Sequence, residues 1–364
     1  MSNDIENVAI GAETIHSAAK EKDTQLTVPD YNISTDVDES IPTEEDLRTL
    51  RRVSDKIPFN IYTIAFIELC ERFSYYGTTA VFTNFIQQPL PPGSSTGNIV
   101  NWDVEKPVAG ALGMGQRAST GLTTFNSFWQ YTMPLFGAYI ADSYLGRFKT
   151  VGYALGIDIF GHIILIMSGL PPVIKNSHGA LACFSLGVIF MGLGTGGFKP
   201  NINPLIVEQL DLTRMVVKTL PTGERVVVDP HLTASRVYHY FYLFINIGAL
   251  AGQLSMVYCE LYVGFWLSYT LPTILLCFCP LVMLWGRKRY KRVPPTGSVL
   301  GRAMKLFALA NKGRWSINPW KTYKQLHDGT FWDSVKPSKF APGTKPKWMD
   351  FNDVCKLPLR KFLK

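Results

Sequence analysis

Three ionisable side chains lie close together in a largely apolar segment, residues 59–88. Glu68, Glu71 and Arg72 are separated by three and four positions, so a helix would carry all of them on one face. At about 1.5 Å per residue, this helix is long enough to cross a hydrocarbon core of about 30 Å. Each charged group costs roughly 2.5–3.5 kcal/mol at the membrane centre, or about 8–10 kcal/mol for three. The charged face therefore requires a polar cavity or a partner charge.

The three charges have two possible roles. Ionisable groups inside a membrane usually mark substrate or proton paths, and this is our interpretation. The alternative is a structural ion pair that locks two helices together. Because the three charges sum to minus one, we expect a cation elsewhere in the membrane, and our candidate is Lys199.

Lys199 lies in residues 192–204, a segment with four glycines and two prolines. Glycines allow helices to approach closely, and prolines leave backbone carbonyls that only packed neighbours or a polar cavity could satisfy. The adjacent Asn201 and Asn203 favour a polar cavity. The alternative for Lys199 is that its side chain extends to the inner membrane surface.

Two further motifs contain polar residues at defined positions. Residues 137–150 have a Gly-x4-Asp-x3-Gly-Arg pattern that includes Asp142, Gly146 and Arg147. Residues 240–250 place Asn246 among aromatic side chains. An aromatic stripe is usually core packing, whereas an amide in an apolar helix indicates a polar contact.

The charges are distributed unevenly along the 364 residues. Residues 1–58 contain 6 Lys and Arg against 13 Asp and Glu, residues 59–286 contain 11 of each, and residues 287–364 contain 19 against 4. A neutral, apolar middle between an acidic start and a basic end is typical of a membrane protein. We expect residues 1–54 to be a disordered cytoplasmic arm.

We therefore predict an all-α membrane protein in which residues 55–286 form a six-helix bundle. Lys and Arg gather before the first span, in alternate loops and after the sixth span, which places both termini in the cytoplasm. Residues 287–364 are predicted to be a basic cytoplasmic linker. Its residues 299–312 would form an amphipathic helix, either on the inner leaflet or in solvent. The predicted spans are 59–88, 118–145, 151–170, 180–207, 238–262 and 265–285.

Catalytic motifs are missing from the sequence. It has no nucleophile–base pair, phosphate-binding loop or spaced metal-ligand cluster. We therefore expect neither an enzyme nor a bound metal or cofactor, and no nucleic-acid partner.

Three motifs together resemble the proton-dependent oligopeptide transporter (POT/PTR) family of the major facilitator superfamily. They are E-x-x-E-R-F-S-Y-Y-G from Glu68, G-T-G-G-F-K-P-N from Gly194 and F-Y-L-F-I-N-x-G from Phe241. The resemblance covers roughly residues 55–350 and is greatest to fungal di- and tripeptide permeases. It implies a major facilitator fold, with a substrate cavity between two six-helix bundles.

The resemblance also implies roles for individual residues. Proton coupling would rest on Glu68, Glu71 and Arg72, with Lys199 paired to one of the carboxylates. The peptide site would be lined by Arg72, Tyr75, Tyr76, Tyr131, Lys199 and Asn246. The Asp142, Gly146 and Arg147 motif resembles the superfamily loop that clamps helix ends in one state and releases them in another. Thr124 stands where animal members have a histidine, and we expect His162 to be structural.

The expected function is symport: a proton gradient would drive import of di- and tripeptides across the plasma membrane by alternating access. Family members have twelve spans, whereas this chain has six and a linker. We therefore expect a truncated product that lacks the second bundle and could associate with a complementary C-terminal bundle. Two alternatives remain open, a carrier of nitrate or another small anion and a non-transporting fragment.

Overall fold

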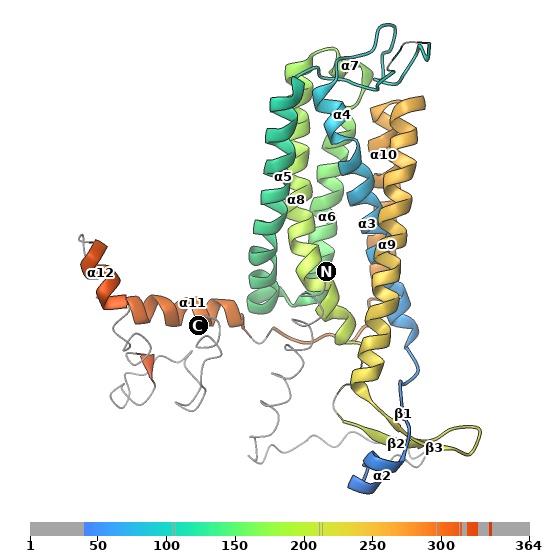
Figure 1. Ribbon diagram of the computed structural model, residues 1–364, viewed down its shortest axis with the longest axis vertical. Helices are drawn as coiled ribbons and strands as arrows, with labels where there is room; N and C mark the ends of the chain where they lie inside the picture. The colour runs from blue at the N-terminus through green and yellow to red at the C-terminus, as the bar shows by residue number, and fades with distance from the viewer. Residues whose placement is uncertain are drawn as a thin grey trace.

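The computed structural model describes residues 40–336, apart from 104, 106, 211, 213, 296, 313, 315–318 and 327–334. Long helices stand side by side as one bundle (Figure 1). The long helices are α3 (Phe59–Ala80), α5 (Gly115–Ile140), α6 (Arg147–Ser168), α8 (Ser177–Val207), α9 (Pro230–Tyr262) and α10 (Phe265–Gly286). Beyond Val81, α3 is followed by the short helix α4 (Phe82–Gln87), and α5 is followed by one π-helical turn, η1 (Ala141–Leu145).

Helix α10 joins two groups of helices. On one side α3 packs against α9 and α10, and on the other α6 packs against α8 and α10. Helix α5 packs against α8, and the short α7 (Pro171–Ile174) connects α6 to α8 at the end far from the sheet (Figure 1). Helix α3, which carries Glu68, Glu71 and Arg72, therefore packs between α9 and α10.

Two glycines of α9 let it approach α3 closely. A Cβ atom added at Gly248 would fall 2.5 Å from the carbonyl oxygen of Leu69, and one at Gly252 would clash with the carbonyl oxygen of Phe73. Both neighbours are backbone atoms, which cannot move aside as a flexible side chain can. Only glycine fits at these two positions.

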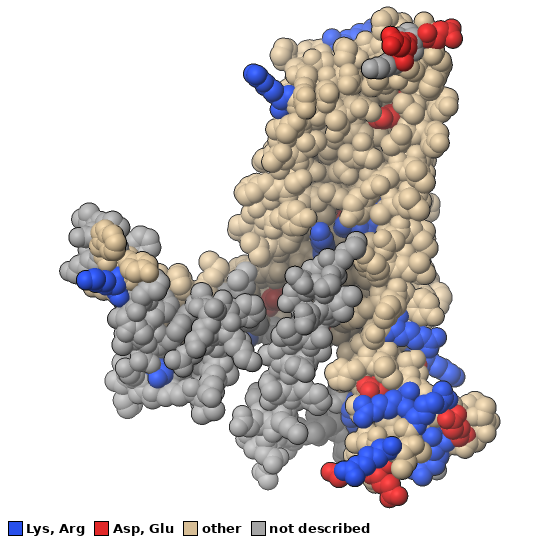
Figure 2. Space-filling model, in the orientation of Figure 1, with Lys and Arg blue, Asp and Glu red and all other residues tan. Residues whose placement is uncertain are grey.

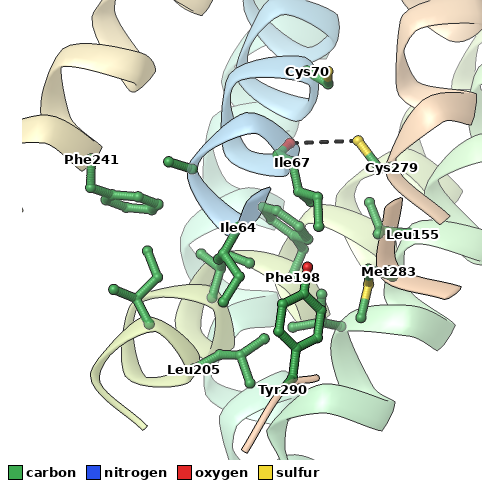
Figure 3. Close-up of a cluster of buried hydrophobic side chains, with 14 of the residues drawn as sticks. Ile64, Ile67, Cys70, Leu155, Phe198, Leu205, Phe241, Cys279, Met283 and Tyr290 are labelled. Carbon is green, nitrogen blue, oxygen red and sulfur yellow. Dashed lines mark hydrogen bonds between the residues drawn. The ribbon is translucent and has the colours of Figure 1, made fainter. Parts of the chain in front are cut away.

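The apolar core lies beside the charged part of α3. Ile64 and Ile67 of α3 pack with Leu155 of α6, Phe198 of α8 and Cys279 of α10 (Figure 3). The Cys279 thiol also donates to the carbonyl oxygen of Ile67 over 3.5 Å. Side chains from four helices thus fix the height of α3 one turn before Glu68.

The sides of the bundle are apolar. Figure 2 shows mostly tan surface along the visible face of the helices, with most charged atoms at the two ends and a few Lys or Arg atoms about halfway along. Within the described part of the chain, α6, α8, α9 and α10 are long and apolar enough to cross a membrane. Helices α3 and α5 are comparable in length but more polar, because α3 carries three charged residues and α5 several Ser, Thr, Asn and Gln. The membrane fold is confirmed, and six spans remain a prediction.

The prediction that residues 1–54 are disordered is wrong for the last part of that range. Helix α2 (Glu44–Thr49) begins with a capping box, in which Thr43 and Asp46 bond reciprocally. These hydrogen bonds from Thr43 hold the pKa of Asp46 below its ordinary value. Strand β1 (Arg52–Val53) then pairs with β3, which a sequence pattern of two residues cannot reveal. Residues 1–39 lie outside the described residues.

A small sheet stands at one end of the bundle, below α9 in Figure 1. Its strand order is β1-β3-β2, with β2 (Val216–Thr219) and β3 (Arg225–Val228) antiparallel and β1 parallel to β3. An ion pair between Arg51 and Glu224, 3.0 Å long, adds to the backbone pairing. We call this end of the bundle the sheet end. Helix α11 (Val299–Asn311) leaves the bundle there, and α12 (Pro319–Leu326) follows it.

The close packing of α9 on α3 makes a prediction about stability. Gly252→Ala should lower the free energy of unfolding of the purified chain by about 1–3 kcal/mol, because the added methyl group forces the two backbones apart. Thermal unfolding in detergent measures this. The control is Gly156→Ala on α6, where nothing lies within 4 Å of the added Cβ. That variant should be unchanged or slightly more stable. Equal midpoints for the two variants would contradict the packing.

Candidate functional site

Helix α3 brings Glu68, Glu71 and Arg72 together inside the bundle. Their exposed fractions are 4%, 0% and 4%. The Arg72 guanidinium lies 3.2 Å from Glu68 Oε1 and 2.5 Å from Glu71 Oε2, so a single cation contacts both carboxylates. We call these three residues the charged triplet. The prediction that they share one helix face away from lipid agrees with these positions.

The charged triplet is not electrically balanced. Two carboxylates share one guanidinium, so the triplet carries a net charge of minus one when both are ionised. Glu68 Oε2 and Glu71 Oε1 are buried and have no hydrogen-bond partner among the described residues. Burying an unpaired charge is expensive, and binding one proton would make the triplet neutral. This arrangement can therefore take up and release a single proton.

Two aromatic rings cover the guanidinium. The Arg72 Cζ atom lies 5.4 Å from the centroid of the Tyr75 ring and 5.9 Å from that of Tyr76. The two rings meet edge to face with centroids 5.0 Å apart. Cation–π contacts of this kind stabilise a desolvated guanidinium. Five of the predicted site residues thus form one continuous cluster.

Lys199 and Tyr131 form a second contact, between α8 and α5. The Lys199 ammonium lies 5.6 Å from the centroid of the Tyr131 ring, whose residue is 78% exposed. Lys199 is also exposed, and the described residues give it no ion pair with the charged triplet. The predicted pair between Lys199 and a triplet carboxylate is therefore not formed in this structure. Lys199 directly follows Phe198, which packs beside Ile67, so it stands at about the height of Glu68.

Asn246 lies apart from both groups. It is exposed on α9, and its side-chain amide donates to the Tyr242 carbonyl oxygen of its own helix over 2.7 Å. The structure brings no other predicted site residue into hydrogen-bond contact with Asn246 in the described region.

Asn201 does not line a polar cavity as the sequence analysis expected. It is buried, and its amide donates to the carbonyl oxygens of Gly197, at 2.8 Å, and Gly137, at 3.3 Å. Gly137 belongs to α5, so the amide links two tightly packed helices. The physical reason is close packing: Gly137 lies against the backbone of Gly196 and Gly197, so the Asn201 amide is enclosed between α5 and α8 and is satisfied by carbonyl oxygens of both helices.

A second buried polar cluster connects α3 with α6. The two ring nitrogens of His162 lie 3.0 Å from Ser74 Oγ and 3.0 Å from the carbonyl oxygen of Asp158. The Asp158 carboxylate lies 3.4 Å from the same ring. Ser74 is one turn beyond Glu71, so the cluster adjoins the charged triplet. Sequence reasoning left this cluster out of the site, although Asp158 and His162 in an apolar helix are visible signals.

The third group lies at the sheet end. Arg147 Nη1 donates to Glu208 Oε1 over 2.6 Å, and Arg147 Nη2 lies 3.9 Å from Asp142 Oδ1. Gly146, which lies between Asp142 and Arg147 in the chain, makes the turn with a φ of +76°, a conformation that favours glycine. The ends of α5, α6 and α8 are thereby joined. Asp142, Gly146 and Arg147 are predicted from their sequence motif, whereas no such motif marks Glu208, the first residue after α8.

Metal chemistry has no candidate centre here. Among the residues that the structure describes, no group of three His, Cys, Asp or Glu side chains could hold a metal ion. The titratable groups of the site are those of the charged triplet, Lys199 and the Asp158–His162 pair.

Comparison with known proteins decides the family. The protein-family model described as "PTR2: POT family" matches residues 148–340 of this chain. The chain belongs to the POT family. The peptide transporter PTR2 of Candida albicans is 36% identical over 309 residues, which are 83% of this chain and 48% of that protein. The peptide transporter PTR2 of Saccharomyces cerevisiae is 33% identical over 317 residues, 86% of this chain and 50% of that protein.

The fold of this POT family chain also has solved counterparts. The in meso crystal structure of the POT family transporter PepTSo superposes with a TM-score of 0.53 at 23% identity. The match covers 72% of this chain and 44% of PepTSo. The predicted family and fold class are confirmed. The chain spans about half the length of the curated relatives it matches.

The charged triplet predicts a specific pattern of stability in this POT family chain. Arg72→Gln should lower the free energy of unfolding by about 3–5 kcal/mol, because both carboxylates lose their counter-ion while they remain buried. Thermal unfolding and size-exclusion chromatography of the purified chain measure the loss. The triple variant Glu68→Gln, Glu71→Gln, Arg72→Gln should recover most of it. Arg117→Gln, at an exposed arginine of α5, is the control. A fully stable Arg72→Gln would contradict the role of the shared cation.

Proposed function

We propose that this chain forms the N-terminal bundle of a proton-coupled symporter that imports di- and tripeptides across the plasma membrane. The observation that carries the proposal is the charged triplet, a buried cluster one proton short of neutrality in an apolar bundle. Membership of the POT family supports it, as do the names of the fungal relatives. The relatives are about twice as long, so the complete carrier would include a second bundle.

The proton and the peptide would compete for the same arginine. When both carboxylates are ionised, Arg72 is held between them. When one carboxyl is protonated, the guanidinium has one fewer partner and could bind the terminal carboxylate of a peptide. Lys199, exposed beside Tyr131, would attract the same carboxylate, because an exposed ammonium can form charge-assisted hydrogen bonds with it. Peptide binding and proton binding would then favour each other.

Alternating access requires contacts that open and close at the ends of the helices. Arg147, Glu208 and Asp142 join three helix ends at the sheet end. A lysine- and arginine-rich sheet end favours the cytoplasm for that end and for both termini. We propose that this clasp forms and breaks as the carrier changes its open side.

The decisive experiment measures uptake of a labelled dipeptide into cells or vesicles with and without an inward proton gradient. Two proteins are compared, the 364-residue chain alone and the chain fused to the second bundle of a fungal relative. Gradient-dependent dipeptide uptake by either protein supports symport. Uptake of nitrate in preference to dipeptides would mean that the substrate is a small anion and not a peptide. Absence of uptake by both proteins, although both reach the plasma membrane, would mean a non-transporting chain.

Glu71→Gln should uncouple peptide transport from proton transport. In the fused protein we expect gradient-driven uptake to fall at least tenfold, because the triplet can no longer exchange a proton. Counterflow exchange of peptide, which needs no net proton movement, should persist. Glu224→Gln, at an exposed residue of the hairpin, serves as the control. Equal loss of both activities would assign Glu71 a structural role.

Lys199→Ala should weaken recognition of the peptide carboxylate. We expect the half-saturation concentration to rise about tenfold, the size of one charge-assisted hydrogen bond. A dipeptide with an amidated C-terminus should bind the wild-type and variant proteins equally, since it lacks the carboxylate. Lys175→Ala, at an exposed lysine in a loop, is the control. An unchanged half-saturation concentration would remove Lys199 from the site.

A further inference from the structure

A polar cavity lies at the sheet end, away from the charged triplet. It has a volume of about 240 Å³ and is walled by the segment before α3, the connection from α8 to β2, the start of α9 and the chain after α10. The first residue of α3 is nine positions before Glu68, so the cavity is about 14 Å from the triplet along the helix axis. The proposed transport does not use this cavity.

The cavity is strongly basic. Lys56, Arg214, Lys218 and Lys291 line it, against one carboxylate from Asp55. Lys218 lies 3.4 Å from that carboxylate. No ion pair within the described region reaches Lys56, Arg214 or Lys291, and all three are exposed. Four cations from three separate segments thus converge on one concave surface with a net charge of plus three.

The walls of the cavity are fixed by partly buried hydrogen bonds. Gln209, which is 3% exposed, accepts from the backbone N–H of Lys291 at 2.9 Å and donates to its carbonyl oxygen at 3.1 Å. On the other side, the backbone N–H of Asp55 donates to Thr233 Oγ1 over 2.9 Å. These bonds tie the segments that carry Lys56 and Lys291 to α8 and α9. The cationic side chains are therefore brought together by the fold rather than by chance on a flexible surface.

We propose that this cavity binds a phosphate-bearing anion. Lysine ammonium groups and an arginine guanidinium are the side chains that bind phosphate in proteins. Basic pockets at the ends of membrane helices on the cytoplasmic side suit phosphorylated lipid head groups in particular. A soluble phosphorylated molecule would present the same groups. Figure 2 shows Lys and Arg atoms gathered at this end of the molecule, with fewer Asp and Glu atoms among them, and the net positive lining of the cavity would attract either anion.

Binding would connect parts of the chain that are distant in sequence. An anion held by Lys56, Arg214 and Lys291 would bridge the approach to α3, the end of α8 and the chain after α10. These are helix ends that a carrier shifts relative to one another when it changes its open side. The anion would therefore stabilise the arrangement of the sheet end seen in this structure.

The experiment measures binding to the purified 364-residue chain in lipid nanodiscs of neutral lipid. The probes are short-chain phosphatidylinositol 4,5-bisphosphate, inositol 1,4,5-trisphosphate and inorganic phosphate, titrated at low and physiological salt. The test variant is Lys56→Gln, Arg214→Gln, Lys291→Gln. The matched control is Arg48→Gln, Lys149→Gln, Lys288→Gln, which removes three exposed positive charges that do not line the cavity. Thermal unfolding verifies that both variants are folded.

We expect the test variant to bind the phosphorylated probe at least tenfold more weakly, and the control variant to stay within twofold of the wild type. Binding of the lipid alone identifies a head group as the ligand, and comparable binding of inositol trisphosphate or phosphate identifies a soluble anion. Equal weakening in the two variants, or no binding by any probe, would overturn the proposal. The result is independent of peptide uptake, because no step depends on transport.

Discussion

One guanidinium shared by two buried carboxylates constrains the rest of this structure. Arg72 cannot face lipid, and neither can Glu68 or Glu71, so helices must surround α3 on the side that carries them. Close approach to α9 requires glycine at 248 and 252, where any side chain would meet the backbone of α3. The apolar cluster one turn away holds the helix at a fixed height. The same buried charges thus constrain how the bundle packs and underlie the proposed exchange of a proton.

Lys199 forms no ion pair with the charged triplet but lies close enough to interact with its charges. The charged triplet is enclosed, whereas Lys199 and Tyr131 are on the exposed face. A ligand at Lys199 cannot influence the triplet through a direct ion pair in this arrangement. The charge of Lys199 does act on the carboxylates of Glu68 and Glu71 through space, so a ligand that neutralised Lys199 would change their electrostatic environment. Tyr75 and Tyr76 add a second contribution, because their ring centroids lie 5.4 Å and 5.9 Å from the Arg72 guanidinium.

Features that depend on residues close together in the sequence could be predicted, whereas contacts between residues far apart in the sequence could not. The spacing of Glu68, Glu71 and Arg72 places them on one helix face whatever surrounds them, and prolines and glycines mark most helix ends. Glu208 looks like any acidic residue after a helix until Arg147, 61 positions earlier, is placed beside it. The buried contact of Glu260 could not be predicted either: its carboxylate accepts a hydrogen bond from Asn84 over 2.8 Å. The pairing of β1 with β3 joins residues 175 positions apart. Each of these depends on how helices pack, which composition and periodicity do not encode.

At the sheet end, the segment after α10 connects the basic cavity to the contacts among Asp142, Arg147 and Glu208. The segment after α10 bonds to Gln209 through the backbone of Lys291, and a few residues later the N–H of Gly297 donates to the carbonyl oxygen of Asp142. It therefore runs from the basic cavity to the clasp of Asp142, Arg147 and Glu208. Gln209 directly follows Glu208, so the end of α8 connects the same two places from the other side. A shift of α8 that breaks the clasp must also move one wall of the cavity. Whatever stabilises the cavity thereby favours the closed clasp, by an amount equal to the difference in its affinity for the two arrangements.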